Sequence, residues 1–410
     1  MSARGIVIIG AGEAGARAAV ALREEGFAGA VTLIGAETFP PYERPPLSKS
    51  VLTSVEEPSP PAIAQAAALE GRDIALFSGV SIVAIDRGAH EIVAGDGRRF
   101  RFDRLCIATG ARPRRLTIGD PEVCLVLRSY DDALALRRRF VAGARIAIIG
   151  GGFIGLELAS SAVCRGCATM IIEAAPRIMT RGVPAEIAEI AARRHQRAGV
   201  ELIVGARIAS IARNTDGAAV VLEDGRRIAA DHLVAGVGAA PDTALAASCG
   251  LAIDNGVAVD GALRTSDPDI FAIGDCASFP HPLYGGRRIR LEAWRNAQDQ
   301  GVFVARSMLG EVAPYAAVPW FWSDQHDLTL QIAGLVDEGR TSAQRDLGDG
   351  ALMLFHLAED HRLVAASAVG PLGKIAREVR LAEILIARRA TPDPAALASP
   401  GVKLKSLLAA

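Results

Sequence analysis

Two copies of a glycine-rich motif are the residues of this chain with the clearest chemical meaning. Each copy reads Gly-x-Gly-x-x-Gly, at residues 10–15 and 150–155, after an apolar run and before a helical pattern. The first glycine allows a tight turn, the second lets backbone approach a pyrophosphate, and the third lets the helix pack on the strand. The phosphates then lie at a helix N-terminus, where free N–H groups and the helix dipole favour anions. Two such motifs predict two bound dinucleotides and electron transfer between them.

The surroundings of the two motifs repeat as well. Asp-Gly-Arg-Arg occurs at residues 96–99 and 224–227, and an aspartate follows each copy at the same spacing, Asp103 and Asp231. Apolar runs that end in small residues come next, at 105–110 and 233–238. Because Asp-Gly between alternating residues favours a hairpin, each half is predicted to form β-α-β, a β-hairpin and a closing strand.

These elements predict an α/β fold with two Rossmann-like dinucleotide-binding domains and a C-terminal α+β domain. Residues 1–112 form the first part of one binding domain, 113–238 form the other, and 239–318 return to the first with a buried strand within 265–275. The third domain, 319–410, has strand-like runs at 328–332, 351–355 and 363–368 and a helix near 374–388.

Composition excludes several classes of protein. The 410 residues are 50% hydrophobic and carry a formal net charge of −1, which is typical of a well-packed globular protein and argues against nucleic-acid binding. The most apolar stretch, 144–163, contains Arg145, Glu157 and four glycines, so we expect the second motif there and no membrane segment. The first strand begins too early to leave room for a signal peptide, which predicts a cytoplasmic location.

Cysteine spacing offers one candidate redox site. Cys164 and Cys167 form the single C-x-x-C pair among six cysteines, which fits a redox dithiol or half of a zinc site. The alternative is two thiols near the end of the helix that follows Gly155. No second C-x-x-C or histidine pair completes a metal site, so none is predicted.

Two carboxylates in the second half have separate explanations. Glu173 ends an apolar run 18 residues after Gly155, where a carboxylate accepts hydrogen bonds from the adenosine ribose diol and repels a 2′-phosphate. This favours NADH over NADPH, although Arg177 follows closely, and the alternative is a solvated acid at a strand end. Glu157 lies in the first turn of a helix, where the dipole alone explains a carboxylate.

Beyond these motifs, the sequence resembles the FAD-dependent ferredoxin reductases of bacterial oxygenase systems. The matching segments cover most of the chain and include residues 10–15, Pro-Pro-Leu-Ser-Lys at 45–49, Ala-Thr-Gly at 108–110, residues 150–157, Ala-Ile-Gly-Asp-Cys at 272–276 and Pro-Trp-Phe-Trp-Ser-Asp-Gln at 319–325. The resemblance implies a glutathione-reductase-like architecture in which the first motif binds FAD and the second binds NADH.

The resemblance also implies site residues. The expected FAD contacts are Gly10, Gly12, Ala14, Gly15, Glu37, Arg44, Pro45, Lys49, Ile82, Ala108, Thr109, Gly110, Arg128, Gly274, Asp275, Trp294 and Trp320. The expected NADH contacts are Gly150, Gly152, Phe153, Ile154, Gly155, Glu157, Glu173, Gly236 and Gly238. Lys49 and Glu157 are expected to pair at the hydride-transfer site, where they align the cofactors. Without the resemblance, the sequence would predict that Arg128 is a solvated side chain and that Trp294 serves packing. At the FAD ribose, backbone groups are an alternative to the Glu37 carboxylate.

The function that the resemblance implies is NADH:ferredoxin reductase. Hydride passes from NADH to FAD, and single electrons pass to a [2Fe–2S] ferredoxin that feeds a Rieske dioxygenase or a cytochrome P450. Residues 37–60 lack the cysteines that disulfide reductases, NADH peroxidases and NADH oxidases of this fold carry there. Two alternatives are an NADH-dependent flavoenzyme for small acceptors and a redox-switched interaction protein resembling apoptosis-inducing factor.

The resemblance places the ferredoxin beside Trp322. We expect neither nucleic acid nor a membrane as a partner, and we expect the protein to be a monomer or a weak homodimer. The alternative for this aromatic segment is a role in interdomain packing. Because ferredoxins are commonly acidic, the arginines near the flavin-contacting segment are expected to attract them: Arg287, Arg288, Arg290 and Arg295.

Overall fold

The computed structural model describes residues 5–214, 217–311 and 313–408, so a few residues of each predicted domain lie outside the described part. The chain divides into two compact units. Unit 1 comprises Met1–Glu43, Ser59–Arg112 and Ala240–Ala317, and unit 2 comprises Arg44–Pro58, Pro113–Ala239 and Val318–Ala410. The segment 44–58, which we grouped with the first binding domain from sequence, therefore packs with the second motif and the C-terminal segment.

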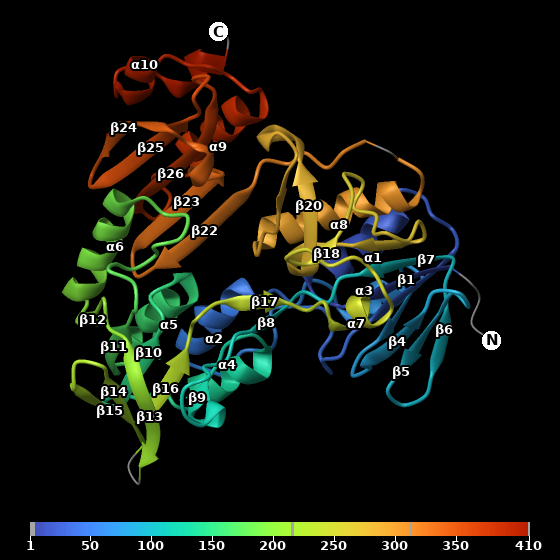
Figure 1. Ribbon diagram of the computed structural model, residues 1–410, viewed down its shortest axis with the longest axis horizontal. Coiled ribbons are helices and arrows are strands. Elements are labelled where there is room, and N and C mark those ends of the chain that lie inside the picture. The colour runs from blue at the N-terminus through green and yellow to red at the C-terminus, as the bar shows by residue number, and fades with distance from the viewer. Residues whose placement is uncertain (1–4, 215–216, 312, 409–410) are drawn as a thin grey trace. The chain divides into compact units, whose positions relative to one another are not determined.

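Unit 1 is built on a five-stranded parallel sheet. Its strands in spatial order are β19 (Ile270–Ala272), β7 (Arg104–Ile107), β1 (Gly5–Ile9), β2 (Ala30–Ile34) and β3 (Ile74–Phe77). Strand β1 is buried at every position, as expected for a parallel strand covered on both faces. Helices α1 (Glu13–Glu24) and α8 (Trp294–Met308) pack side by side (Figure 1), because Gly301 of α8 lets the two backbones approach closely.

Smaller elements complete unit 1. The predicted hairpin at Asp96-Gly97 is confirmed and lies within an antiparallel sheet of β4 (Ile82–Asp86), β5 (Glu91–Ala94) and β6 (Arg99–Arg101). A second small sheet contains β18 (Val257–Ala258), β20 (Ala277–His281) and β21 (Arg287–Ile289). The short helices are α3 (Ala66–Glu70), α7 (Ala244–Ser248), η3 (Gly274–Cys276) and η4 (Pro282–Tyr284). Strands β8 (Ala111–Pro113) and β17 (Ala239–Pro241) lie where the chain passes from one unit to the other.

Unit 2 repeats the parallel sheet around the second motif. Its strands in spatial order are β12 (Glu201–Ile203), β11 (Ala168–Ile172), β10 (Arg145–Ile149), β16 (His232–Ala235) and β9 (Cys124–Leu125). Its helices are η1 (Pro45–Ser48), α2 (Ser50–Thr53), η2 (Pro121–Val123), α4 (Tyr130–Arg137), α5 (Phe153–Cys164) and α6 (Ala185–Arg197). The second predicted hairpin is also confirmed, in the sheet of β13 (Ile208–Asn214), β14 (Gly217–Leu222) and β15 (Arg227–Ala230).

The C-terminal part of unit 2 is a five-stranded antiparallel sheet with helices beside it (Figure 1). Its strands in spatial order are β22 (Trp320–Gln325), β23 (Leu328–Gly334), β26 (Leu363–Pro371), β25 (Ala351–Leu357) and β24 (Thr341–Gly348). Its helices are η5 (Val336–Glu338), α9 (Ala376–Ala387), α10 (Pro394–Ala398) and η6 (Leu404–Leu408). The predicted strands β23, β25 and β26 and the predicted helix α9 are confirmed, whereas the sequence did not predict β22 and β24 as strands.

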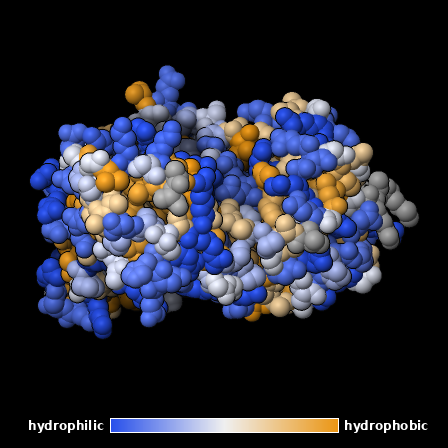
Figure 2. Space-filling view, turned by 90° about the horizontal axis from the view of Figure 1, so that it is seen from above, coloured by the Kyte–Doolittle hydropathy of each residue, from blue (hydrophilic) through white to orange (hydrophobic). Residues whose placement is uncertain are grey.

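The surface is mainly hydrophilic on the face that Figure 2 shows, with hydrophobic residues in small, separate clusters. Such scattered apolar residues are normal on globular proteins. Among the helices of the described residues, none combines the length and the apolar character that a membrane span needs.

Candidate functional site

The first motif forms a narrow backbone turn in unit 1. Gly10 has a φ of +108°, and a Cβ added there would lie 2.1 Å from the carbonyl oxygen of Ala108. A Cβ on Gly15 would lie 1.9 Å from the carbonyl oxygen of Gly10. A Cβ on Gly12 would meet no protein atom within 4 Å. The fold itself therefore requires Gly10 and Gly15, whereas Gly12 borders open space at the start of α1.

The second motif forms the same turn in unit 2. Gly150 has a φ of +107°, and an added Cβ would lie 2.5 Å from the carbonyl oxygen of Gly236. A Cβ on Gly155 would lie 2.1 Å from the carbonyl oxygen of Gly150, while Gly152 again meets nothing within 4 Å. Neither α1 nor α5 has a side-chain cap at its N-terminus. Each helix therefore presents uncapped N–H groups beside an open glycine, and we call these two places the first and second cradles.

Other residues of unit 1 gather at the first cradle. A Cβ on Gly274 would lie 3.1 Å from the Cβ of Ala14, and the Gly274 amide donates to the side-chain oxygen of Gln300 at 2.7 Å. The indole N–H of Trp294 donates to Glu13 at 3.1 Å. Gln300 was not predicted, and its fully buried Nε2 has no partner in the described structure. An unpartnered buried donor beside Gly274, whose backbone approaches Ala14 of the first motif, fits a phosphate-bearing ligand.

Two of the other residues predicted in unit 1 bind protein groups through their side chains. The Thr109 hydroxyl donates to the carbonyl oxygen of Asp242 at 2.7 Å, and Glu37, just beyond β2, accepts from the hydroxyl of Tyr42. Ile82 begins β4 and is partly buried. The predicted FAD residues that lie in unit 1 are Gly10, Gly12, Ala14, Gly15, Glu37, Ile82, Ala108, Thr109, Gly110, Gly274, Asp275 and Trp294. Those that lie in unit 2 are Arg44, Pro45, Lys49, Arg128 and Trp320.

All nine residues predicted for NADH lie in unit 2 around the second cradle or the strands that border it. Glu173 accepts from the amide of Gly151 at 2.7 Å with one oxygen and from the amide of Ala175 at 2.7 Å with the other. The carboxylate thus holds the glycine turn, which the sequence did not show. Its remaining lone pairs can still accept hydrogen bonds from a ribose diol.

Lys49 and Glu157 form the predicted ion pair, with 2.7 Å between Nζ and Oε2. Glu157 is 5% exposed and is the fifth residue of α5, so it lies beyond the first turn in which the sequence placed it. Two further donors reach its carboxylate, the hydroxyl of Ser48 at 2.5 Å and the hydroxyl of Ser323 at 2.7 Å. Because a buried carboxylate needs such partners, these three donors fix its position.

The Lys49 segment is held in unit 2 by a buried arginine that the sequence did not single out. Arg137, at the end of α4, donates to the carbonyl oxygens of Val51, Leu52, Ser54 and Val55 at 2.7–3.2 Å. Val51 and Leu52 belong to α2 and Ser54 and Val55 follow it, so Arg137 provides partners for carbonyls at and just beyond the end of this helix. In the same unit, Arg44 donates to the carbonyl oxygen of Arg128.

The aromatic segment of β22 divides between two faces, because successive side chains of a strand alternate. Phe321 faces α5, with its ring centroid 4.2 Å from that of Phe153. Trp320 and Trp322 stack on the opposite face with centroids 5.4 Å apart, and the Trp322 indole N–H donates to Asp324 at 3.2 Å.

The four arginines expected near the docking site belong to unit 1, whereas Trp322 belongs to unit 2. Arg290 pairs with Glu292 at 2.5 Å, Arg295 with Asp299 at 3.1 Å, and Arg288 with Asp254 at 3.5 Å. These carboxylates offset part of the positive charge that the sequence suggested.

Cys164 and Cys167 do not form a disulfide in the structure. Both thiols are free, Cys164 is exposed at the end of α5, and burial raises the pKa of the Cys167 thiol. The described residues contain no group of three or more His, Cys, Asp or Glu side chains that is suited to a metal ion. The Cys167 thiol donates to the carbonyl oxygen of Val141 at 3.3 Å.

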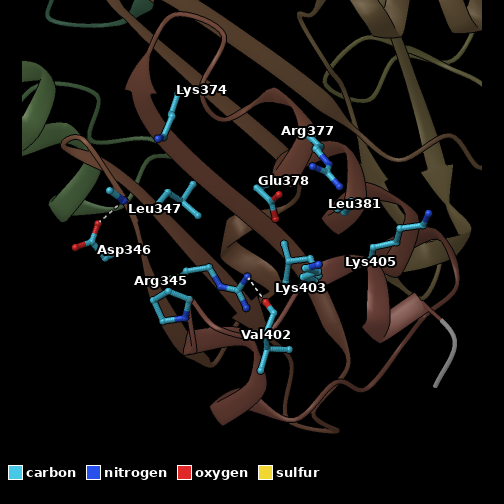
Figure 3. A pocket seen from close by; sticks show the side chains of 13 residues that line it. Arg345, Asp346, Leu347, Lys374, Arg377, Glu378, Leu381, Val402, Lys403 and Lys405 are labelled. Carbon is cyan, nitrogen blue, oxygen red and sulfur yellow. Dashed lines mark hydrogen bonds between the residues drawn. The ribbon is translucent and has the colours of Figure 1, made fainter.

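One cavity of about 640 Å³ lies apart from these residues, between β24, the start of α9 and the C-terminal segment (Figure 3). Arg345 projects into it but donates to the backbone carbonyls of Ala396, Leu397 and Val402. Lys374 pairs with Asp349 at 2.6 Å. Arg345 thus serves the packing of the C-terminal segment and Lys374 pairs with the turn between β24 and β25, and no predicted site residue lines the cavity.

Comparison with known proteins agrees with this geometry. The model of the pyridine nucleotide-disulphide oxidoreductase family matches residues 4–301, and the model described as reductase C-terminal matches residues 320–408. The ferredoxin–NAD(+) reductase component of the anthranilate 1,2-dioxygenase system of Burkholderia cepacia is 39% identical over 413 residues, with 100% of each chain covered.

A second relative differs in its acceptor. The rubredoxin–NAD(+) reductase of Pseudomonas putida is 42% identical over 336 residues, which cover 81% of this chain and 87% of the relative. Among solved structures, the covalent putidaredoxin reductase–putidaredoxin complex matches with a TM-score of 0.93 and 33% identity over 99% of this chain and 98% of that chain. The comparisons confirm the predicted fold class and the resemblance on which the site prediction depends.

Proposed function

Because the chain belongs to the pyridine nucleotide-disulphide oxidoreductase family, whose members use FAD and a nicotinamide dinucleotide, we propose that it is an NADH:ferredoxin reductase of an oxygenase system. The observation that carries the proposal is the pair of equivalent cradles in a chain that matches a ferredoxin reductase over its whole length. When bound, FAD accepts a hydride from NADH and passes electrons singly to an iron–sulfur protein.

The two cradles take different dinucleotides in this proposal. The first cradle holds the FAD pyrophosphate at the N-terminus of α1, where Gly12 leaves room for it and Gln300 offers a free donor. The second cradle holds NADH at the N-terminus of α5 beside Gly152. Lys49 and Glu157 then lie at the hydride-transfer site, where they orient the nicotinamide and supply a fixed local field.

A ferredoxin is the acceptor that the comparisons favour, and a rubredoxin is the second candidate. The rubredoxin reductase has the higher identity but covers only 81% of this chain. The ferredoxin reductase component matches over the whole of this chain and over the whole of its own length. We therefore assign a [2Fe–2S] ferredoxin, which in turn serves a Rieske dioxygenase or a cytochrome P450, and we assign the bacterial cytoplasm and a monomer or weak homodimer.

The test of this function is reconstitution with separate acceptors. Purified protein is expected to contain about one FAD per chain and to reduce a [2Fe–2S] ferredoxin with NADH faster than it reduces a rubredoxin. Faster rubredoxin reduction would select the second candidate. Folded protein that takes up no FAD, or that oxidises NADH only with small acceptors, would contradict the proposal.

Glu173 is expected to determine the preference for NADH. Glu173→Ala should reduce the preference for NADH over NADPH, measured as the ratio of their kcat/KM values, by the equivalent of about 1–3 kcal/mol. The reason is that the variant loses a charged acceptor for the ribose diol and the repulsion of the 2′-phosphate. Glu173→Gln keeps an acceptor for the Gly151 amide and separates loss of charge from disturbance of the turn. A wild-type enzyme that prefers NADPH would refute the assignment.

Trp322 is expected to contact the ferredoxin. Trp322→Ala should lower kcat/KM for ferredoxin roughly tenfold or more, since buried tryptophans often dominate protein interfaces. Turnover of the same variant with NADH and ferricyanide serves as the control and should stay near the wild-type value. If both activities fall equally, Trp322 has a structural role within the β22 sheet and the docking assignment is wrong.

A further inference from the structure

A continuous line of polar side chains, buried except for the half-buried His326 at its outer end, leads away from the Lys49–Glu157 pair. The Ser323 hydroxyl donates to Glu157 at 2.7 Å, and the Gln325 amide donates to Ser323 at 3.0 Å. The Gln325 side-chain oxygen lies 3.0 Å from Nε2 of His195, and Nδ1 of His195 lies 3.1 Å from Nε2 of His326. The line thus joins α5, β22, α6 and the turn after β22.

The carboxylate at one end determines the direction of every hydrogen bond in this line. Glu157 accepts, so Ser323 must donate to it and must accept from the Gln325 amide nitrogen. The Gln325 oxygen then accepts from Nε2–H of His195, whose Nδ1 is left to accept from Nε2–H of His326. Every donor points toward Glu157, and hydrogen bonds aligned in this way strengthen one another.

Both imidazoles are neutral, as this alignment requires. Burial lowers the pKa of His195 to about 4, and His326 and Arg194 lower it further, although the hydrogen bond to Gln325 opposes them. Burial and then Arg194 lower the pKa of His326 to about 4, against Asp327. A neutral imidazole offers one donor and one acceptor, which is the set that the line uses at His195.

His326 has a backbone conformation that does not suit its side chain. Residues 326 and 327 form the two-residue turn between β22 and β23, and His326 has a φ of +56°. Glycine is the preferred residue at such a position. The turn is held by a hydrogen bond from the His326 amide to the Ser160 hydroxyl at 2.8 Å and by the ion pair of Asp327 with Arg194. Local strain of this kind is typical of residues kept for their side chains.

We propose that Ser323, Gln325, His195 and His326 are positioning residues that hold the Glu157 carboxylate in its orientation toward Lys49 for hydride transfer. This inference rests on the proposed function of the pair. The alternative is that the four residues only attach the β22 hairpin to α5 and α6. The two roles differ in what they affect, because a positioning role changes a rate and an attachment role changes the stability of the fold.

His326→Gly separates these roles. The change removes the outermost donor and supplies the residue that the turn prefers, so the melting temperature should stay constant or rise. The rate at which NADH bleaches the flavin absorbance in stopped-flow should fall roughly threefold to tenfold. Electron transfer from the dithionite-reduced variant to ferredoxin should match the wild type, because this step does not involve NADH.

His361→Gly is a matched control in the same unit. His361 is exposed in the turn between β25 and β26 and has a φ of +61°. Its replacement by glycine therefore makes the same kind of backbone change and removes no hydrogen bond of the line that leads to Glu157. Its melting temperature should respond as that of His326→Gly does, while flavin bleaching by NADH stays at the wild-type rate.

Ser323→Ala tests the link nearest to the pair. It should slow flavin bleaching at saturating NADH at least as much as His326→Gly, with a smaller change in the KM for NADH. Wild-type rates in both variants, beside a slow Glu157→Ala variant, would overturn the positioning role and leave the proposed function intact. A wild-type enzyme that NADH does not reduce would instead reject the proposed function itself.

Discussion

Replacing Glu157 with alanine is expected to slow the bleaching of the flavin by NADH by roughly 10- to 100-fold, in line with the loss of charge-assisted hydrogen bonds worth about 1.5–3 kcal/mol. The carboxylate is nearly fully buried and accepts from Ser48, Lys49 and Ser323. Removal of the carboxylate leaves the Lys49 ammonium without its counter-charge, and the Lys49 side chain is then free to move. Stopped-flow measurement at saturating NADH isolates this step from ferredoxin reduction.

Two variants control this result. Glu157→Gln retains the size and the acceptor oxygen, so it should lose less of the rate than Glu157→Ala. Asp349→Asn removes the partner of Lys374 in a lysine–carboxylate pair of similar length, 2.6 Å, that lies at the surface, and it should leave the rate unchanged. An unchanged bleaching rate in folded, FAD-loaded Glu157→Ala would show that the pair has no part in hydride transfer.

Gly152→Ala is expected to weaken NADH binding while the protein folds and keeps its FAD. An added methyl group meets no protein atom within 4 Å, so the fold has no reason to change. The methyl group enters the open space of the second cradle, where the pyrophosphate of NADH is proposed to approach the backbone. Overpacking of this kind costs about 1–3 kcal/mol, which corresponds to a roughly 5- to 150-fold rise in the KM for NADH.

The equivalent change in the first cradle is expected to impair the binding of FAD instead of NADH. Gly12→Ala should lose FAD during purification while its circular dichroism and melting profile show a folded chain. Gly88→Ala, at an exposed turn between β4 and β5, should affect neither cofactor. If Gly152→Ala and Gly12→Ala both retain FAD and wild-type kinetics, the open glycines are not the sites of pyrophosphate approach.

The two cradles could be predicted from the sequence because their determinants are local. Gly10 and Gly150 need a positive φ, and both follow a buried parallel strand and precede a helix within a few residues. Such short-range patterns are imposed by backbone sterics and by the period of the apolar residues. The same reasoning found the Asp-Gly hairpins and the strands β23, β25 and β26.

Strands β22 and β24 were missed for two different physical reasons. In β22, Phe321 packs on α5 while Trp320 and Trp322 stack on the opposite face. Because both faces carry large aromatic side chains, this part of the sequence lacks the alternation of polar and apolar residues that indicates a strand. Strand β24 is at the edge of its sheet and is mostly exposed, so it carries little hydrophobic signal.

By itself, the sequence determined the two cradles, the repeated order of their elements and, through its resemblance, the pairing of Lys49 with Glu157. Only the tertiary structure decided that the segment 44–58 packs in unit 2, that Arg137 holds it there, and that a line of side chains from His326 reaches the carboxylate. Apart from the Gln325–Ser323 bond within β22, those contacts join residues more than 80 positions apart, and no local backbone preference specifies them. They arise because buried polar groups must find partners within the packed unit, wherever in the chain these partners lie.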